Sequence, residues 1–187
     1  RKGINYSGGL DYKINTEHSV SMDARIFIAE RNQPATSEAI IEDVTGNTPT
    51  EILLAETNSK SNSANYNANL HYGFVPNKSA EFTADVSYAR YTFMRETDQP
   101  NAYYSLDDIL LREIVNEYDA NTAIDLISAQ MDYQKKMLNS TFSAGAKYSY
   151  IDTDNGLEFY DIVDEMPVIN NDRSNDFRYL EKIAAAY

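Results

Sequence analysis

One group of acidic side chains in this chain has a spacing that could bind a metal ion. Asp152, Asp154 and Glu158 place three carboxylates at alternate positions around Gly156, an oxygen-rich arrangement that a calcium ion could use. The stretch lacks the twelve-residue loop and closing glutamate of a helix-loop-helix calcium site. It is therefore a weak calcium candidate, and a solvated loop is the simpler interpretation. We predict no other metal site and no bound cofactor.

The two histidines do not indicate a catalytic or zinc site. His18 is expected in a tight turn and His71 on the polar side of a strand, and the chain contains no cysteine. No nucleophile elbow is present, and the Gly8-Gly9 pair lies inside an expected strand, where glycine marks a bulge or close packing. We therefore expect no enzymatic activity.

A row of polar side chains at alternate positions could instead line the interior of a barrel. Exposure of one sheet face to bulk water would give the same alternation, so periodicity alone leaves both interpretations open. The row consists of Asn65, Asn67, Asn69, His71, Asp85, Asp132, Gln134, Lys147 and Arg178.

The elements that carry these residues are predicted to be strands. Six stretches alternate apolar with polar residues, as strands with two unlike faces do. They are Tyr6 to Ile14, Val20 to Ile28, Ala64 to Phe74, Phe82 to Tyr88, Ala129 to Tyr133 and Phe142 to Tyr150, and a seventh begins near Asp176. The pattern predicts an all-β antiparallel meander of about seven long strands.

Links between the stretches alternate short with long. The short links near residues 15–18, 76–78 and 136–139 predict tight hairpins. The long ones, Glu30 to Asn62, Arg95 to Thr122 and Asp152 to Asn175, are expected to be loops on the opposite side. Within the second loop, Ser105 as a cap and an apolar face at Leu106, Ile109, Leu110 and Ile114 predict one short helix over Ser105 to Asp119.

Strand length points toward a membrane. Most of the expected strands that contain these stretches, such as Gly3 to Ile14 and Ser79 to Thr92, reach eleven to sixteen residues. Ordinary soluble strands have roughly five or six, whereas about nine to eleven tilted residues cross a bilayer. Fifteen tyrosines, several near strand ends, would suit a headgroup zone. Turns that alternate short with long are typical of outer-membrane barrels.

Charge and composition exclude further classes of protein and of membrane segment. The formal net charge of -13 repels phosphate backbones, which argues against nucleic-acid binding. No run of eighteen apolar residues could cross a membrane as a helix. Nothing in the 187 residues marks a boundary between two globular domains, so residues 1–187 are expected to be one all-β region.

Four stretches carry a family resemblance: Tyr6 to Arg31, NYNANLHYGFVPN at Asn65 to Asn77, FSAGAKYSYIDTDN at Phe142 to Asn155, and NDFRYLEKIAAAY at Asn175 to Tyr187. Together they resemble the barrel of Bacteroidetes outer-membrane proteins related to TonB-dependent receptors. The resemblance implies a Gram-negative outer membrane, a plug domain, an energy-coupling protein and an unidentified nutrient ligand. It also implies a barrel of about twenty-two strands, so we expect this chain to be an internal fragment of one.

An isolated fragment of this kind must deal with its apolar face in water. We expect it to curl, to self-associate, or to fold the helix and the Ile52 to Leu54 patch back over that face as a second layer. The leading functional hypothesis is a segment of a nutrient receptor or transporter whose long loops contact ligand. The alternative is a soluble secreted β-sheet domain that binds a polymer or protein through those loops.

Overall fold

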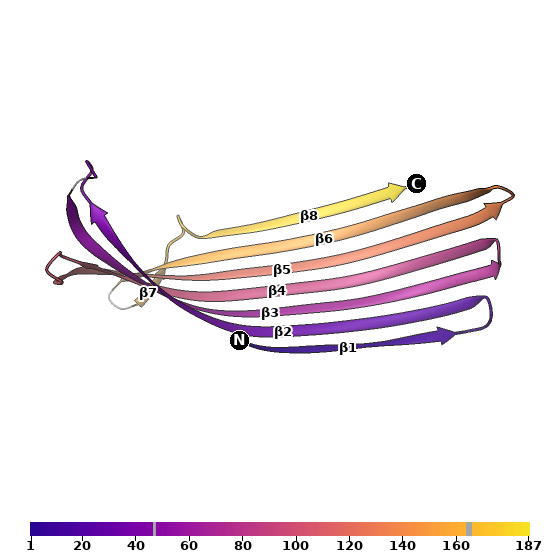
Figure 1. Cartoon of the computed structure of the whole chain (residues 1–187), viewed down its shortest axis with the longest axis horizontal. Helices are drawn as coiled ribbons and strands as arrows, with labels where there is room; N and C mark the ends of the chain where they lie inside the picture. Colours follow the sequence, from indigo (N-terminus) through magenta and orange to yellow (C-terminus); the bar gives the residue numbers. More distant parts are fainter. Residues whose placement is uncertain (47, 164–165) are drawn as a thin grey trace.

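The computed structural model describes residues 1–46, 48–163 and 166–187, which form one antiparallel sheet (Figure 1). Six strands follow one another in order: β1 (Lys2–Lys13), β2 (His18–Glu42), β3 (Pro49–Asn77), β4 (Ala80–Tyr104), β5 (Leu110–Met137) and β6 (Ser140–Val163). Strands β7 (Met166–Ile169) and β8 (Asn175–Ala186) both pair with β6, at different places along it. The prediction of an antiparallel meander shaped like part of a barrel is confirmed, with eight strands instead of about seven.

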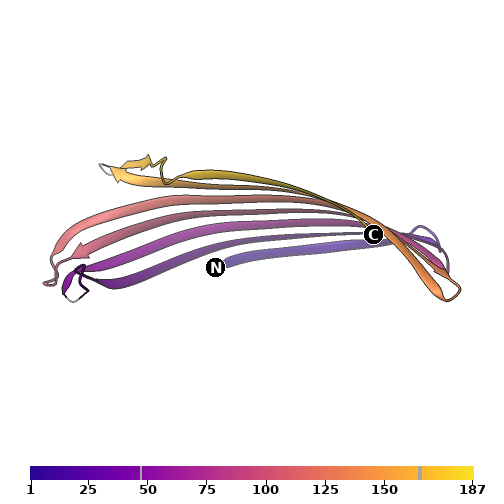
Figure 2. The same cartoon turned by 90° about the horizontal axis from the view of Figure 1, so that it is seen from above.

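The two ends of the sheet differ. At the end that we call proximal, short turns at residues 14–17, 78–79 and 138–139 join the strands. Asn15 closes the first of them, because its side-chain oxygen accepts hydrogen bonds from the backbone N–H groups of Glu17 and His18 at 2.8 and 2.9 Å. At the distal end the strands continue into protruding hairpins. The sheet curves along its length into an open arch (Figure 2).

The three expected long loops are largely strand, and this part of the prediction is wrong. Residues 30–42 and 49–62 extend β2 and β3, and residues 95–104 and 110–122 extend β4 and β5. In the third expected loop, residues 152–163 extend β6 and residues 166–169 form β7. Pro34 is accommodated inside β2 opposite Asn58. Backbone pairing along these extensions satisfies the hydrogen bonds of the peptide groups, so strands form there. The side chains do not alternate cleanly, and for this reason the sequence pattern alone suggested loops.

The expected helix at Ser105 to Asp119 is also wrong. Ser105 does act as a cap, but of a turn: its hydroxyl oxygen accepts hydrogen bonds from the N–H groups of Asp107 and Ile109, both at 3.2 Å. Asp108 takes a left-handed conformation with a φ of 58°. The chain then enters β5, where Arg112 pairs with Tyr103. Over a few residues, apolar spacing fits either element, and pairing with β4 decides between them.

The sheet is a single layer. No segment of the described residues folds back over it. The expectation of a covering layer built from a helix and the Ile52 to Leu54 patch is wrong, because both segments belong to the distal hairpins. Within the described residues, Phe159 is the one hydrophobic side chain that is buried, at 8% exposure. In the same ranges no helix is long and apolar enough to span a membrane.

Candidate functional site

One face of the sheet, which we call the apolar face, carries a continuous band of hydrophobic side chains. Strand register creates it: Leu10, Met22 and Leu70 are successive partners across β1, β2 and β3, and Tyr12, Val20 and Tyr72 form the next such row. Across the remaining strands the band includes Tyr66, Phe82, Val86, Tyr88, Ile127, Met131, Tyr133, Phe142, Tyr148 and Tyr150.

This band is bare. Leu10 and Met131, near opposite sides of the sheet, are 65% and 55% exposed. A contiguous apolar surface that crosses so many strands far exceeds what a water-soluble monomer leaves uncovered. The apolar face is therefore built to contact lipid or another apolar surface.

Charged residues end the band on its distal side. Arg90 and Asp125 are register partners on β4 and β5, joined by an ion pair of 3.2 Å, and the Tyr88 hydroxyl donates to the same carboxylate at 2.8 Å. On the neighbouring strands, Arg178 binds Asp152 through two hydrogen bonds of 2.6 and 3.0 Å. Tyrosines followed by ion pairs are the order of side chains expected from the hydrocarbon to the headgroup region.

The charged border runs obliquely across the strands. Glu30 of β2 is in register, through Asn62, with Met94 of β4, but the first charged residue of β4 is Arg90, four positions nearer the proximal end. In a barrel whose strands tilt by about 40° and lie roughly 4.8 Å apart, residues at the same depth in the membrane are offset by about one position from each strand to the next. From Glu30 of β2 to Lys182 of β8, which is in register with Tyr88 through Tyr150 and Ile127, the border moves six positions over five strand-to-strand steps. On average the border therefore fits strands that cross a flat layer at the tilt of a membrane barrel.

The opposite face, the polar face, is covered by side chains that hydrogen-bond across neighbouring strands. His71 and Asp85 are register partners with their side chains 2.6 Å apart, and Asn69 donates to Asp23 at 2.9 Å. Ser128 and Ser149 pair at 3.2 Å. Because these groups satisfy one another, the polar face is preorganised rather than a set of independent solvated chains.

Eight of the nine residues in the predicted polar row share this face: Asn65, Asn67, Asn69, His71, Asp85, Asp132, Gln134 and Lys147. Arg178 does not. Its register partner is Asp154, and its guanidinium binds Asp152 on the apolar face. The residues from Phe177 to Ile183 do not alternate strictly, so only the register with β6 assigns their faces.

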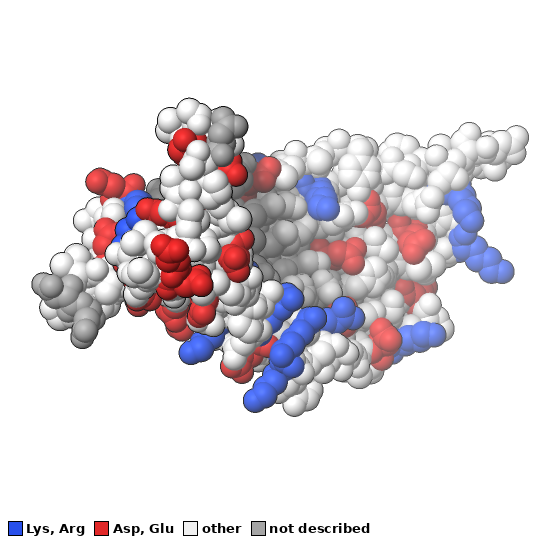
Figure 3. All heavy atoms as spheres, turned by 60° about the vertical axis from the view of Figure 1, so that its left-hand side comes forward, with Lys and Arg blue, Asp and Glu red and all other residues white. Residues whose placement is uncertain are grey.

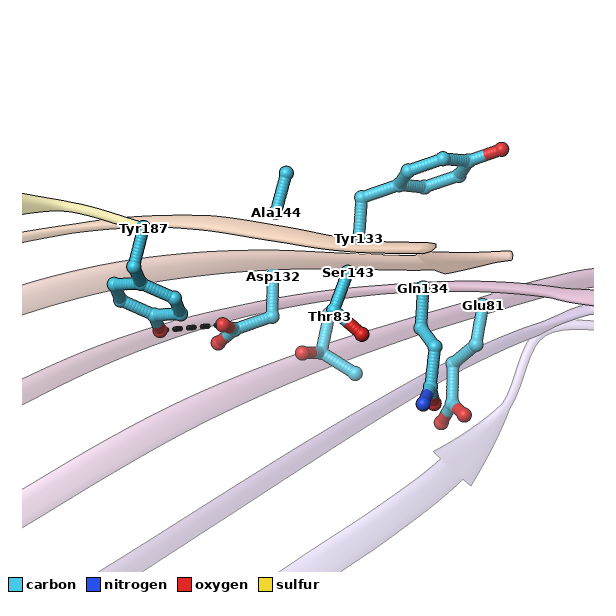
Figure 4. Close-up of a pocket in the computed structure, with 8 residues that line it drawn as sticks. All are labelled: Glu81, Thr83, Asp132, Tyr133, Gln134, Ser143, Ala144 and Tyr187. Carbon is cyan, nitrogen blue, oxygen red and sulfur yellow. Dashed lines mark hydrogen bonds between the residues drawn. The ribbon is translucent and has the colours of Figure 1, made fainter. Parts of the chain in front are cut away.

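A hollow of about 350 Å³ lies on the polar face near the proximal end. Figure 4 shows Glu81, Thr83, Asp132, Gln134 and Tyr187 projecting to one side of the ribbons, while Tyr133 and Ala144 point to the other. The Tyr187 hydroxyl donates to Asp132 at 2.5 Å, and Gln130 donates to the other oxygen of that carboxylate at 2.8 Å.

An ion pair joins the two distal hairpins. Arg112 of β5 binds Glu51 of β3 through two hydrogen bonds of 2.7 and 2.9 Å, and its guanidinium lies 3.9 Å from the centre of the Tyr103 ring. This bond lowers the pKa of Glu51 and raises the pKa of Arg112. The arrangement fixes the two hairpins to each other beyond the charged border.

Acidic side chains gather over the distal hairpins (Figure 3). Glu96, Asp119 and Glu158 are successive register partners across β4, β5 and β6. Partial burial, and then the neighbouring carboxylates Glu96 and Glu158, raise the pKa of Asp119. The Tyr160 hydroxyl donates to Glu158 at 2.5 Å, and this bond raises the pKa of Tyr160 to about 12.

The weak calcium candidate is not assembled. Asp152, Asp154 and Glu158 lie in strand β6 rather than in a loop, and Asp152 is held by Arg178. Residues 1–46, 48–163 and 166–187 hold no group of three or more acidic, histidine or cysteine side chains placed to bind a metal ion. His18 begins β2, where its ring stacks on Phe74 and its Nδ1 lies 2.6 Å from the Tyr72 hydroxyl.

Sequence reasoning missed a cluster on the polar face of the distal hairpins, because it placed these residues in loops. Tyr118 and Phe159 are register partners with stacked rings, and the Arg173 guanidinium lies 3.4 Å from the centre of the Phe159 ring. Arg95 and Thr97 lie on the same face of β4. The signal for them in the sequence is an inverted alternation: the apolar residues of β4 fall on even positions up to Tyr88 and then on odd ones at Tyr91 and Phe93, on the face that also carries Arg95 and Thr97.

Residues 73–187, more than half of the chain, match the model of the family described as "Outer membrane protein beta-barrel family". The matched region begins at Gly73 in β3 and includes β4 to β8 entirely. No curated protein matches the chain.

Proposed function

Because this chain belongs to the outer membrane protein beta-barrel family and resides in the outer membrane, we propose that it forms part of the wall of a TonB-dependent-receptor-like barrel that takes up a nutrient. The observation that carries the proposal is the contrast between the two faces. One face is a bare apolar band with tyrosines and ion pairs at its border, and the other is a hydrogen-bonded polar surface.

In this arrangement the apolar face contacts the bilayer and the polar face lines the lumen. The short proximal turns face the periplasm and the distal hairpins face outward, as in other barrels of the outer membrane. Eight polar-row residues, from Asn65 to Lys147, then point into the lumen, where they contact a plug domain or a passing solute. The distal hairpins, rather than flexible loops, provide the first contact with ligand.

The plug domain and the energy-coupling protein are part of this proposal through the resemblance of Asn65 to Asn77 and Asn175 to Tyr187 to receptors of that kind. The nutrient is not identified by it. We assign no enzymatic step to this region: His71 lies between Ser21 and Asp85 in register, but within the described residues no hydrogen bond joins its ring to a serine hydroxyl.

The alternative of a soluble secreted domain does not fit this surface. Such a domain would bury the band that includes Leu10 and Met131 in a second layer, and both side chains are more than half exposed. Membership in an outer-membrane family also contradicts the assumption of this alternative that the protein is secreted and water-soluble.

The full-length protein should first be tested for a heat-shifted band in the outer-membrane fraction, which reports a closed barrel. A deletion strain would then be grown on a panel of single carbon, nitrogen and iron sources, with and without a proton-motive-force uncoupler. We expect slow growth on at least one source, restored by the intact gene only while the membrane is energised. Equal growth of the deletion strain on every source would refute an uptake role.

A further inference from the structure

Charge is segregated between the two faces of the distal hairpins. On the outer face, the row that contains Lys60 continues through Glu96, Asp119 and Glu158. One residue along each strand, the row on the luminal face contains Arg31, Ser61 and Arg95. Between the rows of Arg25 and Gln33, the luminal face of the described residues in β2 to β6 holds no Asp or Glu. Over these rows, a chain with a net charge of -13 thus presents cations to its lumen.

The two arginines of this row lack acidic partners. Within the described residues, neither Arg31 nor Arg95 forms an ion pair, whereas Arg90, Arg112, Arg173 and Arg178 all do. Arg95 lies 5.2 Å from the centre of the Phe93 ring, and its Nε is buried without a hydrogen-bond acceptor. A buried guanidinium N–H is unfavourable without an acceptor, so an oxyanion placed there would gain an unusually strong bond.

The surroundings of Arg95 form the most enclosed part of the sheet. Thr97 is 1% exposed and Ser61 is 8% exposed, and the Thr97 hydroxyl lies 2.9 Å from that of Ser59. The stacked rings of Tyr118 and Phe159 lie on the same face, one row further along, next to Thr97. Hydroxyls beside a guanidinium suit a carboxylate, phosphate or sulfate. Phe159 is covered by Tyr118 and Arg173, so of the two rings the half-buried Tyr118 is the one that suits an apolar or cyclic body.

We propose that Arg31 and Arg95 form an oxyanion subsite at the outer mouth of the lumen, which selects a small cyclic solute bearing a carboxylate, phosphate or sulfate group. The two side chains start from strands separated by β3, so their Cα atoms lie roughly 10 Å apart and both can reach one such group. The acidic outer face repels the same solutes, which leaves the lumen as their favourable place of contact. This inference rests on the proposed uptake function and names the class of its ligand.

The test uses purified full-length protein and affinity selection with mass spectrometry. The library pairs each cyclic carboxylate, phosphate or sulfate with its neutral amide or alcohol. We expect enrichment of the anionic member of at least one pair, and about tenfold weaker binding of that compound by Arg31→Gln and by Arg95→Gln. Arg95→Lys keeps the charge but loses the planar fork, so it should bind between the wild type and Arg95→Gln.

Lys60→Gln is the matched control. It removes one positive charge from the position before Ser61, but on the outer face, so binding should change less than about twofold. Equal enrichment of the neutral compounds, enrichment of none, or unchanged binding by both arginine variants would overturn the subsite. Arg31 is exposed, so its replacement does not disturb packing if Arg95→Gln fails to assemble.

Binding is measured without energy coupling, so the two proposals fail separately. Growth defects in the deletion strain together with no anion preference would overturn the subsite alone. Selective anion binding without any growth defect would leave the subsite and refute uptake.

Discussion

Gly145 and Tyr187 form a close pair on the ladder between β6 and the end of β8. Their backbones exchange two hydrogen bonds, from Gly145 N to Tyr187 O at 2.8 Å and from Tyr187 N to Gly145 O at 3.0 Å. A Cβ atom at position 145 would lie 2.6 Å from the Tyr187 ring. The missing side chain therefore allows the ring to lie against the sheet, where its hydroxyl reaches Asp132.

Gly145→Ala should destabilise the barrel. The added methyl group would lie 2.5 Å from Asp132 Oδ1 as well as against the Tyr187 ring, so the ring must move and its bond to Asp132 is lost. We expect the free energy of unfolding to fall by about 1–3 kcal/mol, measured by denaturant titration of the full-length protein in lipid vesicles. Gly8→Ala is the control, because nothing lies within 4 Å of its added Cβ. Equal effects of the two substitutions would contradict this packing.

The assignment of lipid and lumen to the two faces can be tested at neighbouring residues. Val86 lies in the middle of the apolar band and is 48% exposed, while Ser87 points to the polar face. Val86→Arg should cost about 2–4 kcal/mol of folding free energy and lower the amount of protein in the outer membrane, because it places a charge in hydrocarbon. Ser87→Arg should change the stability by less than about 1 kcal/mol. The reverse order would exchange the faces.

The transmembrane half of the sheet was predictable because its side chains alternate with few exceptions, such as Phe27. Val20 to Ile28 and Phe142 to Tyr150 each present one face to lipid, and a one-residue slip would expose the wrong face, so pattern and register agree. The distal half was not predictable in this way. Both faces there meet water, and the side chains of β5 from Leu110 to Tyr118 have no reason to alternate.

The residues of the candidate site could likewise be predicted only where the side chains alternate. Asn65, Asn67 and His71 could be assigned to one face because they lie between apolar neighbours on β3. Arg178 could not be assigned to a face from the sequence, because its neighbours on β8 do not alternate. Only its pairing with Asp154 of β6 places it on the apolar face. The mouth residues Arg31 and Arg95 become neighbours only through Ser61, from a third strand.

The Glu51 to Arg112 pair makes the distal hairpins sensitive to acid. The folded-state pKa of Glu51 is lowered, so the stabilisation is present at neutral pH and is lost as pH falls through that pKa, below the ordinary glutamate range. Spin labels at Val44→Cys and Asp107→Cys would report the separation of the two hairpin tips. We expect a narrow distance distribution at neutral pH and a broad one at an acid pH well below the ordinary glutamate range.

Glu51→Gln is the control for this titration, because it removes the carboxylate and keeps the shape of the side chain. Its distance distribution should be broad at both pH values. A narrow distribution for Glu51→Gln at neutral pH would show that other contacts hold the hairpins together.

The ring of Phe159 should stabilise the distal ends of β5 and β6. It stacks on Tyr118, lies under Arg173 and is 8% exposed, so Phe159→Ala removes contacts on two sides. We expect a loss of about 2 kcal/mol, below the usual 3–5 kcal/mol for a core phenylalanine because the sheet is a single layer. Hydrogen exchange should accelerate in the amides of residues 114–120 and 155–161, while those between Ile124 and Tyr133 keep their protection. Phe142→Ala, at a side chain that is 54% exposed, serves as the control and should leave exchange at the distal end unchanged. Faster exchange over the whole of β5 would mean that Phe159 supports the entire sheet rather than its distal hairpins.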